Sequence, residues 1–254
     1  MEPTSTEKHW DQAWSQEDVT TIMASQFPHD RDETHRFFAQ RLRQHSGGRV
    51  LEIGCGEGQL AVYMAKQGAQ VTAVDLSSKA VQMTRANAHH NNVEDQVSAR
   101  QLDALEVANL SGPFDLVIGR FILHHIEPFS AFVEGLDSVL APTGRGLFLE
   151  NSARNRLLML FRNHVTGRFG IPKYGDDEEY PLTRDEVRLL RSTFDVEVHR
   201  PELVLFKKLN TYLIGYDNGL DPLVKIIEAV DDTLYDLVPP LRPYSYLQVL
   251  EIHK

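Results

Sequence analysis

The sequence has almost no cysteine and no long apolar run. Cys55 is the one cysteine among 254 residues, which excludes an internal disulfide and a zinc site built from several cysteines. No stretch approaches the roughly 18 apolar residues of a membrane-spanning helix, and residues 1–25 lack the continuous apolar segment of a signal peptide. We therefore expect a cytoplasmic protein without a membrane span.

Basic residues are also scarce relative to acidic ones. The chain has 26 Lys and Arg against 36 Asp and Glu, and its formal net charge is −10. This balance removes the general electrostatic attraction to a phosphate backbone, although it does not exclude a local basic patch. We expect no nucleic-acid partner. The length suits one domain with elaborations better than two full domains.

A glycine-rich turn early in the chain carries the clearest signal. An apolar run at 50–53, typical of a buried strand, is followed by Gly54, Gly56 and Gly58, and then by a helical pattern. Glycines in such a turn allow unusual backbone conformations and let a ligand approach the main chain near a helix N-terminus. A second apolar strand ends in Asp75, about 20 residues on, where an acid can bind both hydroxyls of a ribose. The pattern predicts a nucleoside-containing cofactor.

The spacing of the glycines differs from that of a dinucleotide site. The dinucleotide fingerprint is G-x-G-x-x-G, whereas this chain reads G-x-G-x-G and has Gln59 at the position of the later glycine. This difference weighs against NAD. An incidental acid after a glycine-rich turn is the alternative without a cofactor.

Two motifs resemble those of the class I S-adenosylmethionine-dependent methyltransferases, in particular the small-molecule group that includes the ubiquinone-biosynthesis methyltransferases. The first motif, E/D-x-G-x-G-x-G with a later acid, is matched by Glu52, Gly54, Gly56, Gly58 and Asp75. The second, F-D-x-V followed by L-H-H-(I/V), is matched by Phe114, Asp115, Val117, Leu123, His124 and His125. The resemblance is continuous over 49–150.

The resemblance implies an α/β fold, a doubly wound, mostly parallel, seven-stranded Rossmann-like sheet whose closing strands include an antiparallel edge. It implies S-adenosyl-L-methionine as the cofactor, S-adenosyl-L-homocysteine as its product, and a small or medium-sized metabolite as the methyl acceptor. We expect a helical cap at 1–48 and a methyltransferase domain at 49–254. Its cofactor half would be 49–150, and its substrate-side half, 151–254, would contain a helical insert at 202–243.

The resemblance also implies which residues hold the cofactor. The glycine turn would contact the amino-acid end of the cofactor. Asp75 would hold its ribose, and Asp103 would accept a hydrogen bond from its adenine amine. Asp103 could instead cap the segment that follows it. The full set of expected contacts is Glu52, Gly54, Cys55, Gly56, Gly58, Asp75, Leu76, Asp103, Ala104, Gly119 and Arg120.

Three residues are candidates for proton transfer. A base is needed only if the acceptor is a weak nucleophile, and the pKa of histidine suits this task, so His124 and His125 are the first candidates. Both could instead pack and form hydrogen bonds in the wall of the pocket. Glu150, at the tip of the fifth predicted strand, could orient a hydroxyl or satisfy the backbone of a helix that starts at Asn151. We expect no metal site, because adjacent histidines on a helix point apart.

The predicted substrate residues lie outside the two motifs. Residues 151–165 predict a basic amphipathic helix whose Arg154, with Arg168 beyond it, could clamp an anionic acceptor or could form a solvated face. Trp14, four residues after Trp10, could belong to a lid or to a helix docked on the core. Tyr180 and Tyr216 suit an aromatic acceptor pocket or ordinary packing. The apolar face at 157–161 makes a homodimer possible.

Other functions stay open from the sequence. An NAD-linked oxidoreductase would share the glycine turn and Asp75 but is opposed by the spacing and by the second motif. A non-catalytic, nucleoside-binding scaffold of the same fold would keep both motifs. A protein side chain is a further conceivable acceptor, and the sequence leaves open whether oxygen, nitrogen or carbon is methylated.

Overall fold

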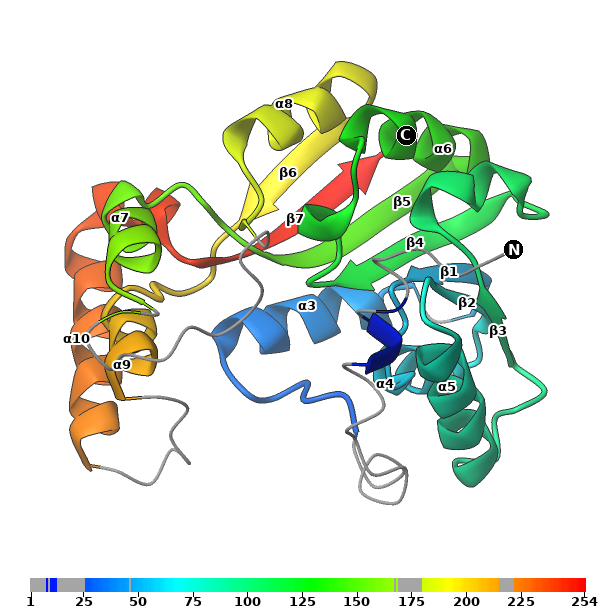
Figure 1. The fold of residues 1–254 in the computed structure, drawn as a ribbon, viewed down its shortest axis with the longest axis horizontal. Coiled ribbons are helices and arrows are strands. Elements are labelled where there is room, and N and C mark those ends of the chain that lie inside the picture. The colour runs from blue at the N-terminus through cyan, green and yellow to red at the C-terminus, as the bar shows by residue number, and fades with distance from the viewer. Residues whose placement is uncertain are drawn as a thin grey trace.

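One mixed sheet organises the chain. The computed structural model describes residues 8, 10–12, 26–45, 47–166, 168, 180–214 and 222–254. The seven strands follow the order β3-β2-β1-β4-β5-β7-β6, which confirms the predicted doubly wound α/β fold (Figure 1). Their bounds are β1 Arg49–Ile53, β2 Gln70–Asp75, β3 Val97–Gln101, β4 Phe114–Arg120, β5 Leu140–Asn151, β6 Asp195–His199 and β7 Leu247–His253.

The family resemblance implied an antiparallel edge, but the antiparallel strand lies inside the sheet. β7 pairs antiparallel with both β5 and β6, so it lies between them, and β6 forms the edge. β7 is buried on both faces, with Val249 in one core, Leu250 and Ile252 in the other, and all three at 0% exposure. An internal position therefore suits this strand, which is buried on both faces, better than an edge would.

Helices cover both faces of the sheet (Figure 1). α3, α4 and α5 pack on one face, and α6 and α8 pack on the other. α7, α9 and α10 gather beyond the end of β5 and the start of β7. The bounds are α3 Glu33–Arg43, α4 Gln59–Ala65, α5 Ser78–His90, η1 Ala104–Asn109, η2 Leu123–His125, α6 Phe129–Val139, α7 Arg156–His164, α8 Arg184–Thr193, α9 Phe206–Ile214, α10 Pro222–Leu237 and η3 Pro239–Tyr244.

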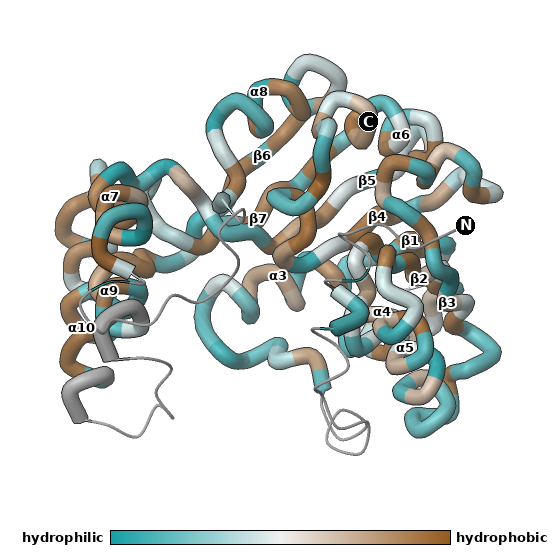
Figure 2. Tube along the Cα trace, in the orientation of Figure 1, coloured by the Kyte–Doolittle hydropathy of each residue, from teal (hydrophilic) through white to brown (hydrophobic). Residues whose placement is uncertain are grey.

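Alternate side chains of the central strands point into two separate cores. Val50 and Ile118 belong to the core beneath α3 and α4, whereas Leu51 and Val117, their sequence neighbours, belong to the core beneath α6. A strand buried on both faces must be apolar at nearly every position. Figure 2 shows this as brown segments through the centre of the sheet. The sheet core therefore fixes the strand ends from which the candidate site is built.

Two helices begin with a side-chain cap. The Ser77 hydroxyl accepts hydrogen bonds from the Lys79 and Ala80 N–H groups at the start of α5. Thr183 and Glu186 form a capping box at the start of α8. Such caps satisfy backbone donors that the helix cannot satisfy itself, and each contributes about 1 kcal/mol.

The prediction of a helix over 151–165 is wrong in its first part. Asn151 is the last residue of β5, because this strand is paired on both sides, with β4 and with β7. The helix α7 begins only at Arg156, where the side chain of Asn155 accepts hydrogen bonds from the Leu157 and Leu158 N–H groups. Arg154 therefore lies in the connection before the helix and not on its face.

A small helical unit adjoins the sheet. Leu158 and Met159 of α7 pack with Val204 and Tyr246 in a core of their own. Asp231 of α10, 2% exposed, accepts hydrogen bonds from backbone N–H groups at the start of α9, including that of Lys207. The predicted insert at 202–243 thus contains two helices, α9 and α10, which are joined by these hydrogen bonds. Among the described residues, no helix is long and apolar enough to cross a membrane.

Candidate functional site

The glycine turn joins β1 to α4 at the carboxyl edge of the sheet. Gly54, Gly56 and Gly58 have φ values of 68°, 49° and 74°, the left-handed region that favours glycine. A Cβ atom on Gly58 would lie 2.8 Å from Cα of Thr84, so α5 leaves no room for a side chain. The turn therefore presents bare main chain, as the sequence predicts.

Asp75 is held against this turn. Its Oδ2 accepts a hydrogen bond from the Gly56 N–H at 2.9 Å, and its Oδ1 accepts one from the Ser77 N–H at 2.9 Å. Burial raises the pKa of Asp75, and the charge of Asp11 acts in the same direction. Each carboxylate oxygen has a second lone pair, so the group can still accept hydrogen bonds from two hydroxyls. The structure thus brings the two halves of the first motif together.

The N-terminal residues reach the same strand ends. Asp11 accepts hydrogen bonds from the hydroxyls of Ser77 and Ser78 and from the Lys79 N–H. Although burial opposes the shift, these bonds lower the pKa of Asp11. The Trp10 ring meets the His125 ring edge-on, with 5.1 Å between centroids. The sequence reading did not single out Asp11, because a lone acid in a polar segment gives no signal of its own.

Glu52 is a buried acid within β1. Its side chain is 3% exposed, and among the described residues its Oε2 has no hydrogen-bond partner. Burial raises the pKa of Glu52 to about 8, while the nearby charge of Arg120 partly opposes the shift. A buried acceptor without a partner next to a glycine turn fits a ligand that brings an ammonium group.

This burial predicts an unusual dependence of stability on pH. Unfolded Glu52 ionises near pH 4.5, but folded Glu52 stays protonated up to about pH 8, so stability falls as pH rises between these values. Glu52→Gln removes the ionisable group. We expect its melting temperature at pH 7.5 to exceed that of the wild type by about 5 °C, with little difference at pH 4.5. Thermal unfolding across this range would measure the effect, with the exposed Glu134→Gln as the control. A variant less stable than wild type at pH 7.5 would contradict the assignment.

The other predicted cofactor residues follow strand ends or lie in them. Gly119 is buried in β4 opposite Ile53 of β1, and Arg120 follows it and donates a hydrogen bond to Gln59 at 3.0 Å. Asp103 caps η1, with its Oδ1 accepting from the Leu105 N–H, so the alternative role of a cap is present. Leu76 follows Asp75 and Ala104 follows Asp103, and both are half-buried. Cys55 is buried, and its Sγ accepts a hydrogen bond from the Thr84 hydroxyl. Their contacts with a cofactor stay predictions.

His124 and Glu150 form a buried pair. Nδ1 of His124 lies 2.7 Å from Oε2 of Glu150, and the two side chains are 5% and 0% exposed. Oε1 of Glu150 accepts hydrogen bonds from the Ile122 and Leu123 N–H groups at 2.8 and 2.7 Å. Glu150 therefore accepts hydrogen bonds from the backbone after β4. The alternative expectation, that it satisfies the backbone of a helix starting at Asn151, is wrong. Because its carboxylate faces Nδ1, the neutral imidazole carries its proton there and can accept one at Nε2.

The predicted substrate residues are not brought together. The guanidinium of Arg154 lies over the Tyr244 ring, 5.7 Å from its centroid. Tyr180 is exposed, and Arg168 is exposed as well. Trp14 and Tyr216 lie outside the described residues. The roles of all five with an acceptor stay predictions.

Two cavities lie at opposite edges of the sheet. One of about 500 Å³ is lined by first residues of the parallel strands, among them Gln70 and Val97, far from the glycine turn. The other, of about 220 Å³, is lined by Phe121 after β4, Asn151 at the end of β5, and residues of α3 and α9. Ligands of doubly wound sheets bind at the carboxyl ends of the strands, so the second cavity is the functional candidate. In the part of the chain the structure describes, no group of three or more His, Cys, Asp or Glu side chains is placed to hold a metal.

Comparisons with known proteins agree with this geometry. Residues 23–187, more than half of the chain, match a family described as "Methyltransferase domain". The ubiquinone biosynthesis O-methyltransferases of Xylella fastidiosa and Xanthomonas axonopodis pv. citri are 34% and 36% identical over 122 residues. These matches cover 48% of this chain and 48% and 49% of the relatives, so the chain spans about half the length of the relatives it matches.

Solved structures share the whole fold. Geranyl diphosphate C-methyltransferase from Streptomyces coelicolor has a TM-score of 0.59 at 12% identity, covering 99% of this chain and 98% of its own. Magnesium protoporphyrin IX methyltransferase from Synechocystis has a TM-score of 0.58 at 16% identity, covering 98% of both chains. At this identity the likeness is one of fold.

Proposed function

Because the chain belongs to the methyltransferase-domain family, we propose that it transfers a methyl group from S-adenosyl-L-methionine to a small or medium-sized metabolite. The observation that carries the proposal is the carboxylate of Asp75 bonded to the backbone of the glycine turn. The names of the relatives given above describe the methylation of small molecules, which favours a small acceptor here. The family match also favours this donor over NAD.

The residues of the turn fit this cofactor. Asp75 would bind the ribose hydroxyls, and the main chain at Gly54–Gly58 would lie against the methionine part. The ammonium group of the methionine part suits the Glu52 oxygen that has no partner among the described residues. When bound, S-adenosyl-L-methionine supplies a methyl group already activated on a sulfonium. The protein then contributes mainly alignment and exclusion of water. Trp10 and Asp11 support a role for residues 1–48 as a cap over these strand ends.

His124 is our candidate for the general base. Its Nε2 would take the proton of an acceptor hydroxyl, while Glu150 fixes the tautomer and stabilises the imidazolium that forms. Glu150 is thus a positioning residue. This assignment favours an acceptor that must lose a proton, as an oxygen acceptor does, and it agrees with the names of the O-methyltransferase relatives.

The acceptor would occupy the 220 Å³ cavity. Phe121 lines this cavity and directly precedes the segment that Glu150 holds. Its other walls come from α3 and α9, which supports a methyltransferase domain at 49–254 with substrate-side elements at 151–254, capped by 1–48 and by the insert 202–243. A cytoplasmic location and the lack of a nucleic-acid partner stay predictions.

A homodimer also stays a prediction. Leu157 and Leu160 of α7 are 62% and 56% exposed, and they supply the apolar face that the sequence indicated. Light scattering after gel filtration would decide between monomer and dimer.

An acceptor screen would test the proposed activity. The protein would be incubated with S-adenosyl-L-methionine carrying a labelled methyl group and a library of phenols, carboxylic acids, amines and carbon acids. We expect labelled product from at least one hydroxyl acceptor. Tight binding of S-adenosyl-L-homocysteine without transfer to any class would favour the non-catalytic scaffold instead.

A further inference from the structure

Two arginines lie on either side of the start of β7. Arg154 comes shortly after the carboxyl end of β5, and Arg200 directly follows that of β6. β7 lies between these two strands and runs antiparallel to both. The Arg154 guanidinium lies 5.7 Å from the centroid of the Tyr244 ring, just before β7. Nη2 of Arg200 donates a hydrogen bond to Oε1 of Gln248 in β7 at 2.6 Å. Both arginines are therefore at the edge where ligands of doubly wound sheets bind.

A third arginine approaches from α8. Arg184 is the first residue of this helix, and Leu182, just before it, forms a parallel bridge with Ser152. The Ser152 N–H also donates a hydrogen bond to the carbonyl of Tyr246, directly before β7. These backbone contacts bring Arg184 to the connection that carries Arg154. Three cations thus gather at this edge, although the net charge of the chain is −10. We call Arg154, Arg184 and Arg200 the arginine cluster.

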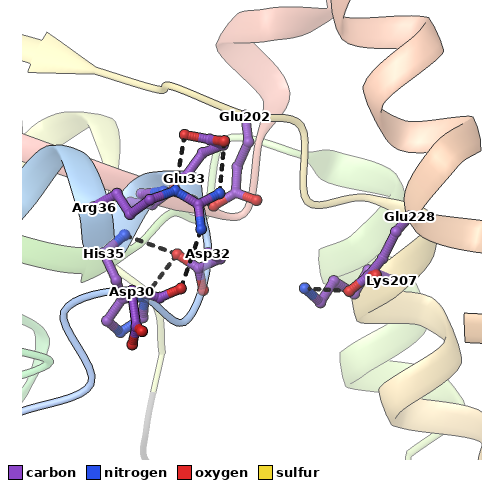
Figure 3. Close-up of polar contacts among 9 residues, drawn as sticks. Asp30, Asp32, Glu33, His35, Arg36, Glu202, Lys207 and Glu228 are labelled. Atoms are coloured by element: carbon purple, nitrogen blue, oxygen red, sulfur yellow. Dashed lines mark hydrogen bonds and ion pairs between the residues drawn. The ribbon is translucent and has the colours of Figure 1, made fainter. Parts of the chain in front are cut away.

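No acidic side chain pairs with the arginine cluster. Within the described part of the chain, none of its three guanidinium groups lies within ion-pair distance of an Asp or Glu carboxylate. Figure 3 shows how other cations of this protein are neutralised, with Arg36 paired to Glu33 at 2.6 Å and Lys207 paired to Glu228 at 2.8 Å. Unpaired charges of one sign repel one another. An anion bound among them would offset this repulsion.

Most guanidinium donors of the cluster are unused. A guanidinium has five N–H donors. Among the described residues, the bond to Gln248 is the one hydrogen bond that the guanidinium of Arg200 makes. The Nε atoms of Arg200 and of Arg154 are both buried and have no hydrogen-bond partner there. A buried donor without a partner destabilises a folded protein, and a ligand with several acceptor oxygens would satisfy both donors.

The surroundings of Arg200 agree with this geometry. Burial lowers the pKa of Arg200 to about 10, and the charges of Arg154, Arg191 and Arg184 act in the same direction. The guanidinium of Arg200 therefore stays charged at neutral pH, in surroundings that carry further positive charge. Arg191 uses its donors elsewhere, because its Nε and Nη2 point to the Val196 carbonyl at 3.4 and 3.3 Å.

We propose that the arginine cluster binds a phosphate group. A phosphate monoester carries a charge of about −1.5 to −2 at pH 7 and three strong acceptor oxygens, which guanidinium groups often bind in pairs. A carboxylate has one charge and two oxygens, so it would neutralise less of the cluster. The site is separate from the glycine turn, since β4, β5 and β7 lie between β1 and β6 in the sheet. The proposal therefore does not depend on methyl transfer.

The sequence-based expectation named a different pair. It gave the anion to Arg154 together with Arg168. The strand order β5-β7-β6 brings Arg200 to the other side of β7 instead, and the bridge between Ser152 and Leu182 adds Arg184. These contacts join segments that are far apart in the chain, so sequence spacing gives no sign of them.

Calorimetric titration of the full chain at pH 7 with phenyl phosphate, benzoate and neutral benzamide tests the proposal. We expect one phenyl phosphate per chain, bound about 10-fold or more tightly than benzoate, and weaker binding still of benzamide. Arg200→Gln should lower the affinity for phenyl phosphate by about 10-fold or more, because it removes a charged donor group. The matched control is Arg188→Gln, an exposed arginine of α8 paired with Asp185, which should leave the affinity unchanged.

A second variant keeps the test valid if Arg200→Gln folds poorly. Arg184 is exposed, so Arg184→Gln should keep the wild-type melting temperature and still weaken phenyl phosphate by about 3-fold or more. Saturating S-adenosyl-L-homocysteine should leave the phenyl phosphate affinity of the wild type unchanged. Competition between the two ligands would move the anion to the glycine site and overturn the proposal. So would an absence of phenyl phosphate binding, equal binding of benzoate, or an unchanged affinity in Arg184→Gln.

Discussion

Asp75→Asn should weaken the binding of S-adenosyl-L-homocysteine by about 100-fold or more. The wild-type carboxylate offers acceptors on both oxygens, whereas an amide offers one oxygen and turns its NH2 group toward either a ribose hydroxyl or a backbone N–H. Hydrogen bonds to a charged group contribute about 1.5–3 kcal/mol each, and losing two of them accounts for the factor. Calorimetric titration of both proteins at pH 7.5 measures it.

Asp115→Asn provides the matched control. Oδ2 of Asp115 also accepts a hydrogen bond from a backbone N–H, that of Arg49 at 2.8 Å, but at the amino edge of the sheet. We expect this variant to lose comparable local bonding and to keep its affinity for the cofactor product. Equal losses in both variants would point to general destabilisation rather than to ribose binding.

His124→Asn should lower kcat for a hydroxyl acceptor by about 10²–10⁴ while leaving the affinity for S-adenosyl-L-homocysteine within a few-fold of wild type. An asparagine keeps a polar group beside Glu150 but cannot take the proton. Single-turnover rates with saturating donor would measure the chemical step, and the exposed His89→Asn controls for the loss of a histidine.

Glu150→Gln tests the positioning role of the same pair. Its amide NH2 would face Nδ1 of His124 and favour the tautomer in which Nδ1 accepts, which leaves the proton on Nε2. We expect kcat to fall with little change in KM. If His124→Asn retained full kcat with a hydroxyl acceptor, the pair would be a structural feature of the wall and not the base.

Local motifs were predicted well because their geometry is local. The glycine turn and Asp75 lie on adjacent strands joined by one short helix, so their spacing alone brings them together. The doubly wound sheet was implied by the family resemblance.

Contacts between distant segments could not be predicted in this way. Glu150 meets Ile122 and His124 only because β4 and β5 are neighbours in the sheet, and sequence gave no reason to choose this partner over Asn151. The wall of the smaller cavity that α9 supplies depends on Asp231, which accepts hydrogen bonds at the start of this helix. Arg154 was assigned to a helix face on periodicity, although strand pairing extends β5 and moves the helix start to Arg156.

Parallel calorimetric titrations of the wild-type protein with S-adenosyl-L-homocysteine and with NAD test the central claim most directly. The glycine turn, the Asp75 carboxylate and the buried oxygen of Glu52 predict one molecule of S-adenosyl-L-homocysteine bound per chain and no measurable binding of NAD. Binding of NAD alone, or of neither ligand, would contradict the account.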